Sequence, residues 1–281
     1  MFWYNGELIA AESLFALDSP VDMASLDAGL KFGASVFSTL RGYAGRLEHP
    51  MTQWQAHCDR IQNSLTYFHW QSPDWHAVQQ GAQQMKNHYP VLRLTCFPDG
   101  KVWISGRDLP PLLSQQQKEG VACWLAPPEY ARSLPAHKTG NYLSCWLARQ
   151  QAQQQGGQEA ILTNAAGYWL ETATGNLWGW ADGQWWTPIS HKIENQCLPG
   201  IMRSQWIDLL SRSGAKVETC LWNSSVVNRF EAIAYSNCVV QLLPIHTIFN
   251  THTTLEYDSH HASLKALQQL VISYTESNDP S

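Results

Sequence analysis

The amino-acid sequence predicts two α+β domains. Short strand patterns and helical patterns alternate in both halves of the chain, which is typical of this class. The segment Asp108-Leu-Pro-Pro-Leu-Leu fits neither pattern, so we place the domain boundary near residue 119. The predicted domains span residues 1–119 and 120–281. With 281 residues, of which 44% are hydrophobic and 15% are charged, the chain can bury a core in each domain.

Two kinds of local signal define the first half. Asn5-Gly6 suits a two-residue hairpin turn, in which both central residues take positive φ. Trp54, Ile61 and Leu65 recur at helical spacing. We therefore expect strands at 2–4, 7–9, 34–43, 46–47, 91–96 and 102–105, and helices at 51–65 and 74–89.

Glycines mark the ends of helical patterns in the second half, at Gly156 and Gly214. We expect helices at 141–155, 201–213 and 263–275, and strands at 121–126, 159–163, 168–171, 176–180, 184–187 and 232–236. The four strands between 159 and 187 follow one another closely, so we expect them to form a meander. Four tryptophans in these strands are interpreted as core aromatics: Trp178, Trp180, Trp185 and Trp186.

Composition and charge argue against several classes of function. The net charge is −5 and no long run of lysine and arginine occurs, so we expect no nucleic-acid partner. No stretch of about 18 apolar residues predicts a membrane span, and the N-terminal segment does not resemble a signal peptide. The seven cysteines form no C-x-x-C pair, which favours reduced thiols in a cytoplasmic protein over disulfides or a zinc site. The His260-His261 pair is expected in solvent rather than at a metal.

Lys138 is the first candidate for chemistry. It lies in a loop of turn-forming residues, just before the helix expected from Asn141. Taken alone, such a lysine is most often a solvated surface residue. Its interpretation therefore depends on other residues.

Three further features change that interpretation. Glu171 ends an apolar strand, so it is either a surface charge or a partly buried acid that needs a cation beside it. Gly200 opens a helix whose free N–H groups can bind phosphate, unless this is an ordinary loop-to-helix junction. Arg60 suits phosphate binding, unless it is a surface arginine on an amphipathic helix. Together with Lys138 they fit pyridoxal phosphate, which needs a lysine for its aldehyde, an acid for its ring nitrogen, and an arginine and N–H groups for its phosphate.

The chain resembles the class IV aminotransferases, the fold-type IV pyridoxal-phosphate enzymes. These include branched-chain aminotransferases, D-amino-acid aminotransferases and 4-amino-4-deoxychorismate lyases. The resemblance lies in the order and spacing of the segments 27–33, 37–41, 57–60, 138–143, 171–177, 200–203 and 236–244. It implies a smaller N-terminal α/β domain, a larger C-terminal domain with a barrel-like sheet that carries Lys138, and the cofactor in the cleft between the domains. It also implies a homodimer that acts on a small-molecule substrate.

The resemblance implies roles for individual residues. Lys138 matches the lysine that binds the cofactor aldehyde and later moves the substrate proton. Glu171 matches the partner of the ring nitrogen, and Arg60 matches the phosphate arginine. Ile201 and Met202 match the positions whose backbone amides hold the phosphate. The remaining matched cofactor positions are Asn176, Leu198, Asn237 and Cys238.

Finer features indicate which member of the family the chain resembles most. Ser38-Thr39-Leu40-Arg41 is closer to the lyases than to the branched-chain enzymes, and Phe37, Thr39 and Arg41 are the candidate substrate residues. Some lyases likewise have Ile-Met-Arg at the helix start and an asparagine followed by a small residue, as in Asn237-Cys238. Met202 and Cys238 lack the hydroxyl groups with which aminotransferases often hold the phosphate. We hypothesise that the Asn237 amide compensates.

Three functions remain open from the sequence. The leading hypothesis is a 4-amino-4-deoxychorismate lyase, which releases pyruvate and 4-aminobenzoate for folate biosynthesis. The alternative is an aminotransferase for branched-chain or D-amino acids with 2-oxoglutarate, which the segment 137–143 favours. The third is a binding module of the same fold without cofactor, against which the retention of Lys138, Glu171 and Arg60 argues.

Overall fold

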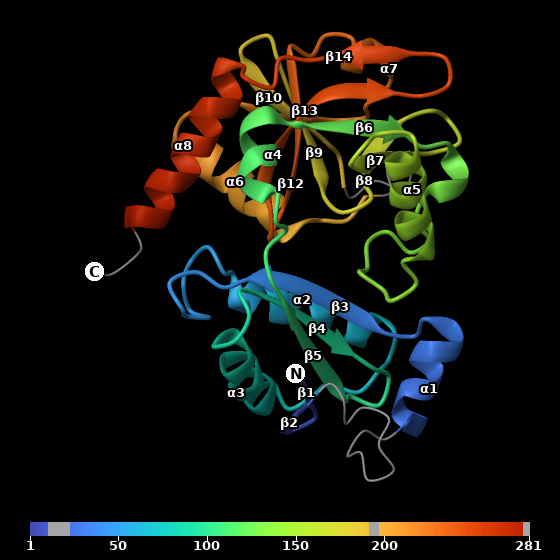
Figure 1. Cartoon of the computed structure of the whole chain (residues 1–281), viewed down its shortest axis with the longest axis vertical. Helices are drawn as coiled ribbons and strands as arrows, with labels where there is room; N and C mark the ends of the chain where they lie inside the picture. Colours follow the sequence, from blue (N-terminus) through green and yellow to red (C-terminus); the bar gives the residue numbers. More distant parts are fainter. Residues whose placement is uncertain (11–22, 191–196, 278–281) are drawn as a thin grey trace. The chain divides into compact units, whose positions relative to one another are not determined.

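The computed structural model describes residues 1–10, 23–190 and 197–277, which form two compact units (Figure 1). Met1–Pro110 and His137–Asn141 belong to the first unit, and Pro111–Ala136 and Tyr142–Glu276 to the second.

This division differs from the expected boundary near residue 119. Residues up to 119 include α4 (Leu113–Glu119), a helix of the second unit in which the Gln117 side chain donates to the Val240 carbonyl at 3.0 Å. The segment that carries Lys138 was expected in the C-terminal domain. It groups with the first unit because its backbone pairs with the start of β3 (Val36–Arg41).

The first unit is built on an antiparallel sheet with the order β2-β1-β5-β4-β3 among its described residues. Besides β3, its elements are β1 (Phe2–Tyr4), β2 (Glu7–Ile9), α1 (Met23–Phe32), α2 (Trp54–Tyr67), α3 (Trp75–Lys86), β4 (Val91–Cys96) and β5 (Val102–Arg107). Apolar side chains of α2 and α3 pack with those of one sheet face into a buried core. The hairpin at Asn5-Gly6 is confirmed, with φ of 43° and 111° at these two residues.

The strand expected at residues 46–47 is reduced to a single position. Arg46 makes an isolated antiparallel bridge with Tyr43. β3 pairs along its whole length with β4. The longer ladder satisfies more backbone groups and places Leu40 opposite Leu92, both of them fully buried.

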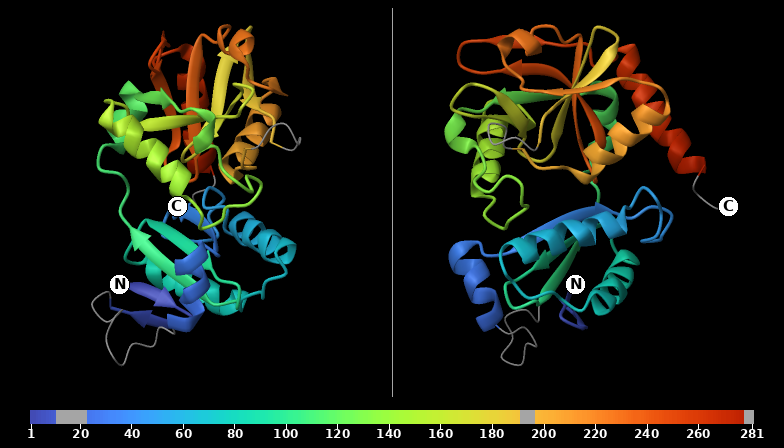
Figure 2. Two further views of the ribbon diagram at one scale, coloured as in Figure 1. Left: turned by 90° about the vertical axis from the view of Figure 1, so that its right-hand side faces the viewer. Right: turned by 180° about the vertical axis from the view of Figure 1, so that it is seen from behind.

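The second unit contains a larger mixed sheet with the order β11-β10-β9-β12-β13-β6-β7-β8, and β14 beside β13, among its described residues. Its strands are β6 (Val121–Leu125), β7 (Glu159–Thr163), β8 (Trp169–Thr172), β9 (Asn176–Ala181), β10 (Gln184–Pro188), β11 (Val217–Cys220), β12 (Ala232–Asn237), β13 (Gln241–Phe249) and β14 (Thr254–Glu256). Its helices are α4, η2 (Pro128–Tyr130), α5 (Leu143–Gln154), α6 (Ile201–Arg212), α7 (Ser224–Val227) and α8 (Ala262–Ser277). α6 and α8 lie on one side of the sheet and α5 on the other (Figure 2).

The larger sheet curls until its two end strands approach each other. The backbone N–H of Trp169 in β8 donates to the carbonyl of Trp222, just after β11, at 2.8 Å. This is the barrel-like sheet that the resemblance implied. The expected meander is wrong at its centre, because β9 lies beside β12 and not beside β8 in the sheet that the structure describes. β12 is almost entirely buried, and it pairs with β9 on one edge and with β13 on the other.

Several short or unusual elements were not predicted: α1, α4, α7, β11, β13 and β14. β13 contains Pro244, and a proline inside an apolar run normally argues against a strand. The interpretation of the strand tryptophans as core residues is confirmed for Trp178, Trp185 and Trp186, while Trp180 is half-buried. Within the described ranges, every helix is too short or too polar to cross a membrane.

Candidate active site

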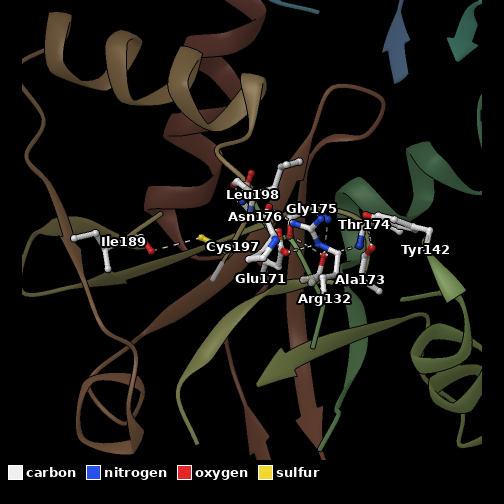
Figure 3. A network of polar contacts seen from close by, with 12 residues as sticks. Arg132, Tyr142, Glu171, Ala173, Thr174, Gly175, Asn176, Ile189, Cys197 and Leu198 are labelled. Atoms are coloured by element: carbon white, nitrogen blue, oxygen red, sulfur yellow. Dashed lines mark hydrogen bonds and ion pairs between the residues drawn. The ribbon is translucent and has the colours of Figure 1, made fainter. Parts of the chain in front are cut away.

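Glu171 is a buried acid in the second unit. Its side chain lies in β8 and the residue is 4% exposed. Arg132 donates from Nε to Glu171 Oε1 at 2.8 Å, and the backbone N–H of Leu198 donates to Oε2 at 3.1 Å (Figure 3). Glu171 is therefore a buried acid with a cation beside it, and not a surface charge.

Arg132 is a functional candidate that the sequence did not single out. Its guanidinium is also buried, and it donates to the Pro135 carbonyl at 2.6 Å. Burial lowers the pKa of Arg132, but the charge of Glu171, its hydrogen bond to Arg132 and the neighbouring Tyr142 and Cys145 together outweigh burial, so the pKa is raised. The two residues are 39 positions apart in the sequence, so no local sequence pattern predicts their contact.

Asn176 and Gly200 bring two loops of the second unit together. The Asn176 side chain donates from Nδ2 to the Leu198 carbonyl at 2.8 Å. A Cβ at Gly200 would lie 1.9 Å from Asn176 Oδ1, so only glycine allows this approach. α6 begins directly after Gly200, and in this described segment no side chain caps its first turn. The N–H groups of Ile201 and Met202 are thus presented at a helix start in the way that binds anions.

The side chain of Met202 turns away from this helix start. It is 1% exposed, and its sulfur accepts a hydrogen bond from Trp206 Nε1 at 2.6 Å. Any contribution of Met202 to anion binding therefore comes from its backbone. Cys238, the other position without a hydroxyl, is also buried.

Asn237 holds the turn at the end of β12. Its Oδ1 accepts from the backbone N–H groups of Val239 and Val240, each at 2.9 Å, and its Nδ2 donates to the Thr174 carbonyl at 3.2 Å. Most of the amide's hydrogen-bonding capacity is thus used within the protein. The hypothesis that Asn237 compensates for the hydroxyl groups missing at Met202 and Cys238 therefore depends on the second hydrogen of its Nδ2.

Two more residues not singled out by the sequence hold the loop between Glu171 and Asn176. Tyr142 donates from its hydroxyl to the Ala173 carbonyl at 3.0 Å (Figure 3). Thr174 donates from its hydroxyl to Glu159, a fully buried acid of β7 whose pKa is raised by burial. The loop is therefore fixed at both of its central residues.

Lys138 lies in the first unit, on a segment that extends the sheet. The backbone N–H of Phe37 donates to the Lys138 carbonyl at 2.8 Å, and the N–H of Gly140 donates to the Ser35 carbonyl at 2.7 Å. A Cβ at Gly140 would lie 2.9 Å from the backbone carbonyl oxygen of Gly33, so this close pairing requires glycine. The Lys138 amine lies 4.7 Å from the centre of the Phe37 ring.

Arg60 belongs to a second polar network, on α2. It donates to the Ser38 hydroxyl of β3, and Ser38 Oγ lies 2.5 Å from Nδ1 of the fully buried His57. Burial, Arg60 and Lys138 all lower the pKa of His57, so the imidazole is neutral. The next turn of α2 reaches the lysine segment, because Ser64 Oγ lies 3.0 Å from His137 Nδ1. One helix thus contacts both Arg60's partner strand and the residue before Lys138.

Three polar side chains share the sheet face opposite the core of the first unit. Thr39 lies opposite Arg93 of β4, and Arg41 lies two residues further along the same face of β3. The Arg93 guanidinium stacks 3.6 Å from the centre of the Phe37 ring. The sequence singled out Phe37, Thr39 and Arg41. It missed Arg93, which only the β3–β4 register identifies.

A family model described as "Amino-transferase class IV" matches residues 35–248. The chain belongs to this family. Among similar curated proteins, the aminodeoxychorismate lyase of Vibrio harveyi is 23% identical over 277 residues, 92% of this chain and 94% of the relative. The branched-chain-amino-acid aminotransferase of Salmonella typhimurium is 24% identical over 271 residues, 88% of this chain and 84% of the relative.

Solved structures of both kinds share the fold of this class IV chain. The branched-chain amino acid aminotransferase of Escherichia coli has a TM-score of 0.80 at 22% identity, covering 100% of this chain and 96% of that one. A putative 4-amino-4-deoxychorismate lyase of Legionella pneumophila has a TM-score of 0.74 at 17% identity, covering 88% and 93%. The fold is therefore fold-type IV, as the resemblance implied.

Class IV aminotransferases are pyridoxal-phosphate enzymes, so the chain is one as well, and its side chains fit this cofactor. The second unit supplies Glu171, whose carboxylate oxygens each accept one hydrogen bond and retain a lone pair for another donor. It also supplies the helix start after Gly200, which a Cβ would obstruct. In the first unit, burial and then the positive charges of Arg60 and Lys138 lower the pKa of His57.

Proposed function

We propose that the protein is a 4-amino-4-deoxychorismate lyase, which releases pyruvate and 4-aminobenzoate in folate biosynthesis. One observation carries the proposal: Arg41 and Arg93 flank Thr39 on one face of the first unit's sheet. The substrate has two carboxylates, one on its ring and one on its enolpyruvyl group. Two guanidinium groups on one surface suit such a dianion, because each binds a carboxylate through paired hydrogen bonds.

Features of the phosphate positions support the same choice. Met202 and Cys238 resemble some lyases at positions where aminotransferases often carry hydroxyl groups. With the Met202 side chain turned into the core, we expect the backbone N–H groups of Ile201 and Met202 to bind the phosphate. Leu198 and Asn176 shape the loop before this helix start. Arg60 contributes the charge.

Lys138 and Glu171 perform the acid-base work in this proposal. Pyridoxal phosphate, when bound, supplies an electron-accepting ring next to the amine-bearing carbon of the substrate. The Lys138 amine takes the proton from that carbon, and the ring–oxygen bond to the enolpyruvyl group breaks. The departing enolate gains a proton and leaves as pyruvate, and the remaining ring becomes aromatic. Glu171 holds positive charge at the ring nitrogen, and Phe37 and Thr39 border the substrate.

The proposal is tested by mixing the purified protein with enzymatically generated aminodeoxychorismate and measuring both products. We expect pyruvate and 4-aminobenzoate in equal amounts. Arg41→Met and Arg93→Met should each raise KM for this substrate by about 10-fold, from the loss of a charged hydrogen bond. Arg212→Met, at an exposed arginine in the last turn of α6, is the control and should leave KM unchanged.

The aminotransferase remains the second candidate, because the chain is as similar to branched-chain enzymes as to the lyase. Lys138 would then move a proton between two carbon positions of the substrate. Transfer of an amino group from branched-chain or D-amino acids to 2-oxoglutarate, without release of 4-aminobenzoate, would overturn the lyase proposal. A cofactor-free binding module would give no visible absorbance band with pyridoxal phosphate at all.

The resemblance also leads us to propose a homodimer in the cytoplasm. Sedimentation of the purified protein at several concentrations tests the dimer. A single species of the monomer mass, 31.7 kDa, at all concentrations would contradict it.

A further inference from the structure

The network around Glu171 contains one charged residue that the proposed function has not used. Arg132 lies in the loop between η2 and Ala136, with a side chain 3% exposed beside a Glu171 side chain 6% exposed. Few charged side chains are buried so fully unless they are paired. The position of Arg132 therefore calls for an explanation in terms of its partner.

Two donors fix the orientation of the Glu171 carboxylate. Arg132 Nε binds Oε1 and the Leu198 N–H binds Oε2, at 2.8 and 3.1 Å. Both donors are themselves held: Arg132 through its second contact to the Pro135 carbonyl, and Leu198 through the Asn176 amide. The carboxylate plane is thus fixed from both sides, as Figure 3 shows.

The charge of Arg132 also bears on where a shared proton lies. A ring nitrogen and a carboxylate that share one proton can be an ion pair or a neutral pair. Arg132 lies in direct contact with the carboxylate, so it stabilises the negative charge there more than it opposes a positive charge on a group beyond it. The ion pair is therefore favoured, with the proton on the ring nitrogen. Without Arg132, burial favours the neutral acid.

We infer that Arg132 is a positioning residue: it orients the Glu171 carboxylate and, by supplying its counter-charge, holds the proton on the cofactor's ring nitrogen. This inference rests on the proposed role of Glu171 as the ring-nitrogen partner. A protonated ring accepts electrons better than a neutral one, so Arg132 acts on the reaction through Glu171 without touching the substrate.

The experiment compares Arg132→Met and Arg132→Lys with the wild-type chain, each loaded with pyridoxal phosphate labelled with nitrogen-15 in the ring. The nitrogen-15 chemical shift reports whether the ring nitrogen carries a proton. Quenching of the chain's tryptophan fluorescence reports cofactor affinity. We expect Arg132→Met to lose the protonated signal and to bind the cofactor about tenfold more weakly, the size typical of groups that orient a ligand from behind. Arg132→Lys, which keeps the charge, should recover the protonated signal.

Three further variants separate the possible results. Arg229→Met removes an exposed arginine paired with Asp182 in the same unit and should match the wild type in both measurements. If Arg132→Met is insoluble, Arg132→Gln takes its place, because it keeps a hydrogen-bond donor and removes the charge. It should lose the protonated signal, and a retained signal would overturn the counter-charge role.

Arg132→Met could instead lower thermal stability and leave the nitrogen-15 shift and the cofactor affinity unchanged. Arg132 would then have a structural role alone, and the inference would be overturned. Glu171→Gln tests the proposed role of Glu171 as the ring-nitrogen partner. If Glu171→Gln alone leaves the ring nitrogen protonated, the assignment of Glu171 itself fails, whatever Arg132 does.

Discussion

Two arginine networks in this chain differ in the partner that each arginine meets. In the second unit, Arg132 contacts the Glu171 carboxylate, so the buried pair is balanced in charge. In the first unit, Arg60 donates to the Ser38 hydroxyl next to the neutral His57. Burial lowers the pKa of His57, and the positive charges of Arg60 and Lys138 lower it further.

The difference indicates what each network can bind. A region that holds two cationic side chains attracts an anion such as a phosphate, whereas a balanced Arg–Glu pair suits a polar N–H donor. This difference in charge is what the proposed roles of Arg60 at a phosphate and of Glu171 at a ring nitrogen require. The following changes test whether charge is what distinguishes them.

Removal of the lysine in the positive region should have the largest effect. Lys138→Ala deletes the amine that we propose binds the cofactor aldehyde and moves the proton, so we expect activity to fall on the order of 10³-fold or more. Borohydride reduction followed by mass spectrometry should find the cofactor mass on the wild-type chain and not on the variant. Lys31→Ala, on the exposed face of α1, is the control and should retain both. A reduced adduct on Lys138→Ala would show that another lysine binds the cofactor.

Removal of one partner from each network should show the next largest contrast. Glu171→Ala leaves the buried Arg132 without its carboxylate, so we expect a loss of about 3–5 kcal/mol in the free energy of unfolding. Ser38→Ala removes an uncharged hydroxyl and should cost about 1–3 kcal/mol, because His57 loses a buried partner. Urea unfolding of the cofactor-free chains measures both. Equal losses would mean that charge is not what separates the two networks.

The pH dependence of stability tests the positive region more finely. Since the folded-state pKa of His57 is lowered, the unfolded chain takes up a proton near the usual value of 6.5 while the folded chain does not. Stability from this residue is fully present above pH 6.5 and is lost as the pH falls below it, by up to about 1.4 kcal/mol per pH unit.

His57→Gln should flatten this decline in urea unfolding between about pH 7.5 and about pH 5.5. His260→Gln, at an exposed histidine, should leave the slope as in the wild type. Parallel curves for the wild type and His57→Gln would contradict the neutral imidazole.

An exposed ion pair provides the smallest expected effect. Arg229 pairs with Asp182 at the surface of the second unit, with side chains 49% and 58% exposed. Solvent screens such a pair, so Arg229→Ala should change the free energy of unfolding by about 0–1 kcal/mol. A loss as large as that of Glu171→Ala would show that exposure does not explain the contrast.

Much of both networks could be predicted from the sequence, but their partners could not. Local patterns of a few residues indicated three of the site features. Glu171 ends an apolar strand, Arg60 lies in a helical repeat, and Gly200 precedes a helix. Arg132 and Ser38 acquire their contacts from strand order and loop packing, which join residues far apart in the chain. The roles assigned to these residues stay predictions.

The fold shows the same division. β4 was predicted with its exact bounds, because its apolar and polar residues alternate. β13 was missed, because Pro244 masks a strand whose neighbours β12 and β6 supply the ladder. Pairing partners such as β9 with β12 depend on how the sheet curls, which no single segment encodes.

The short segment around Lys138 has a consequence for synthesis of the protein. β3 is the edge strand of the first sheet, and the backbone of residues 138–140 pairs with its beginning. A nascent chain that has emerged only to residue 110 contains every strand of that sheet but leaves this edge uncovered. Uncovered edge strands promote association between chains. The edge of the first unit's sheet is therefore covered during synthesis only after residues 138–140 have left the ribosomal exit tunnel.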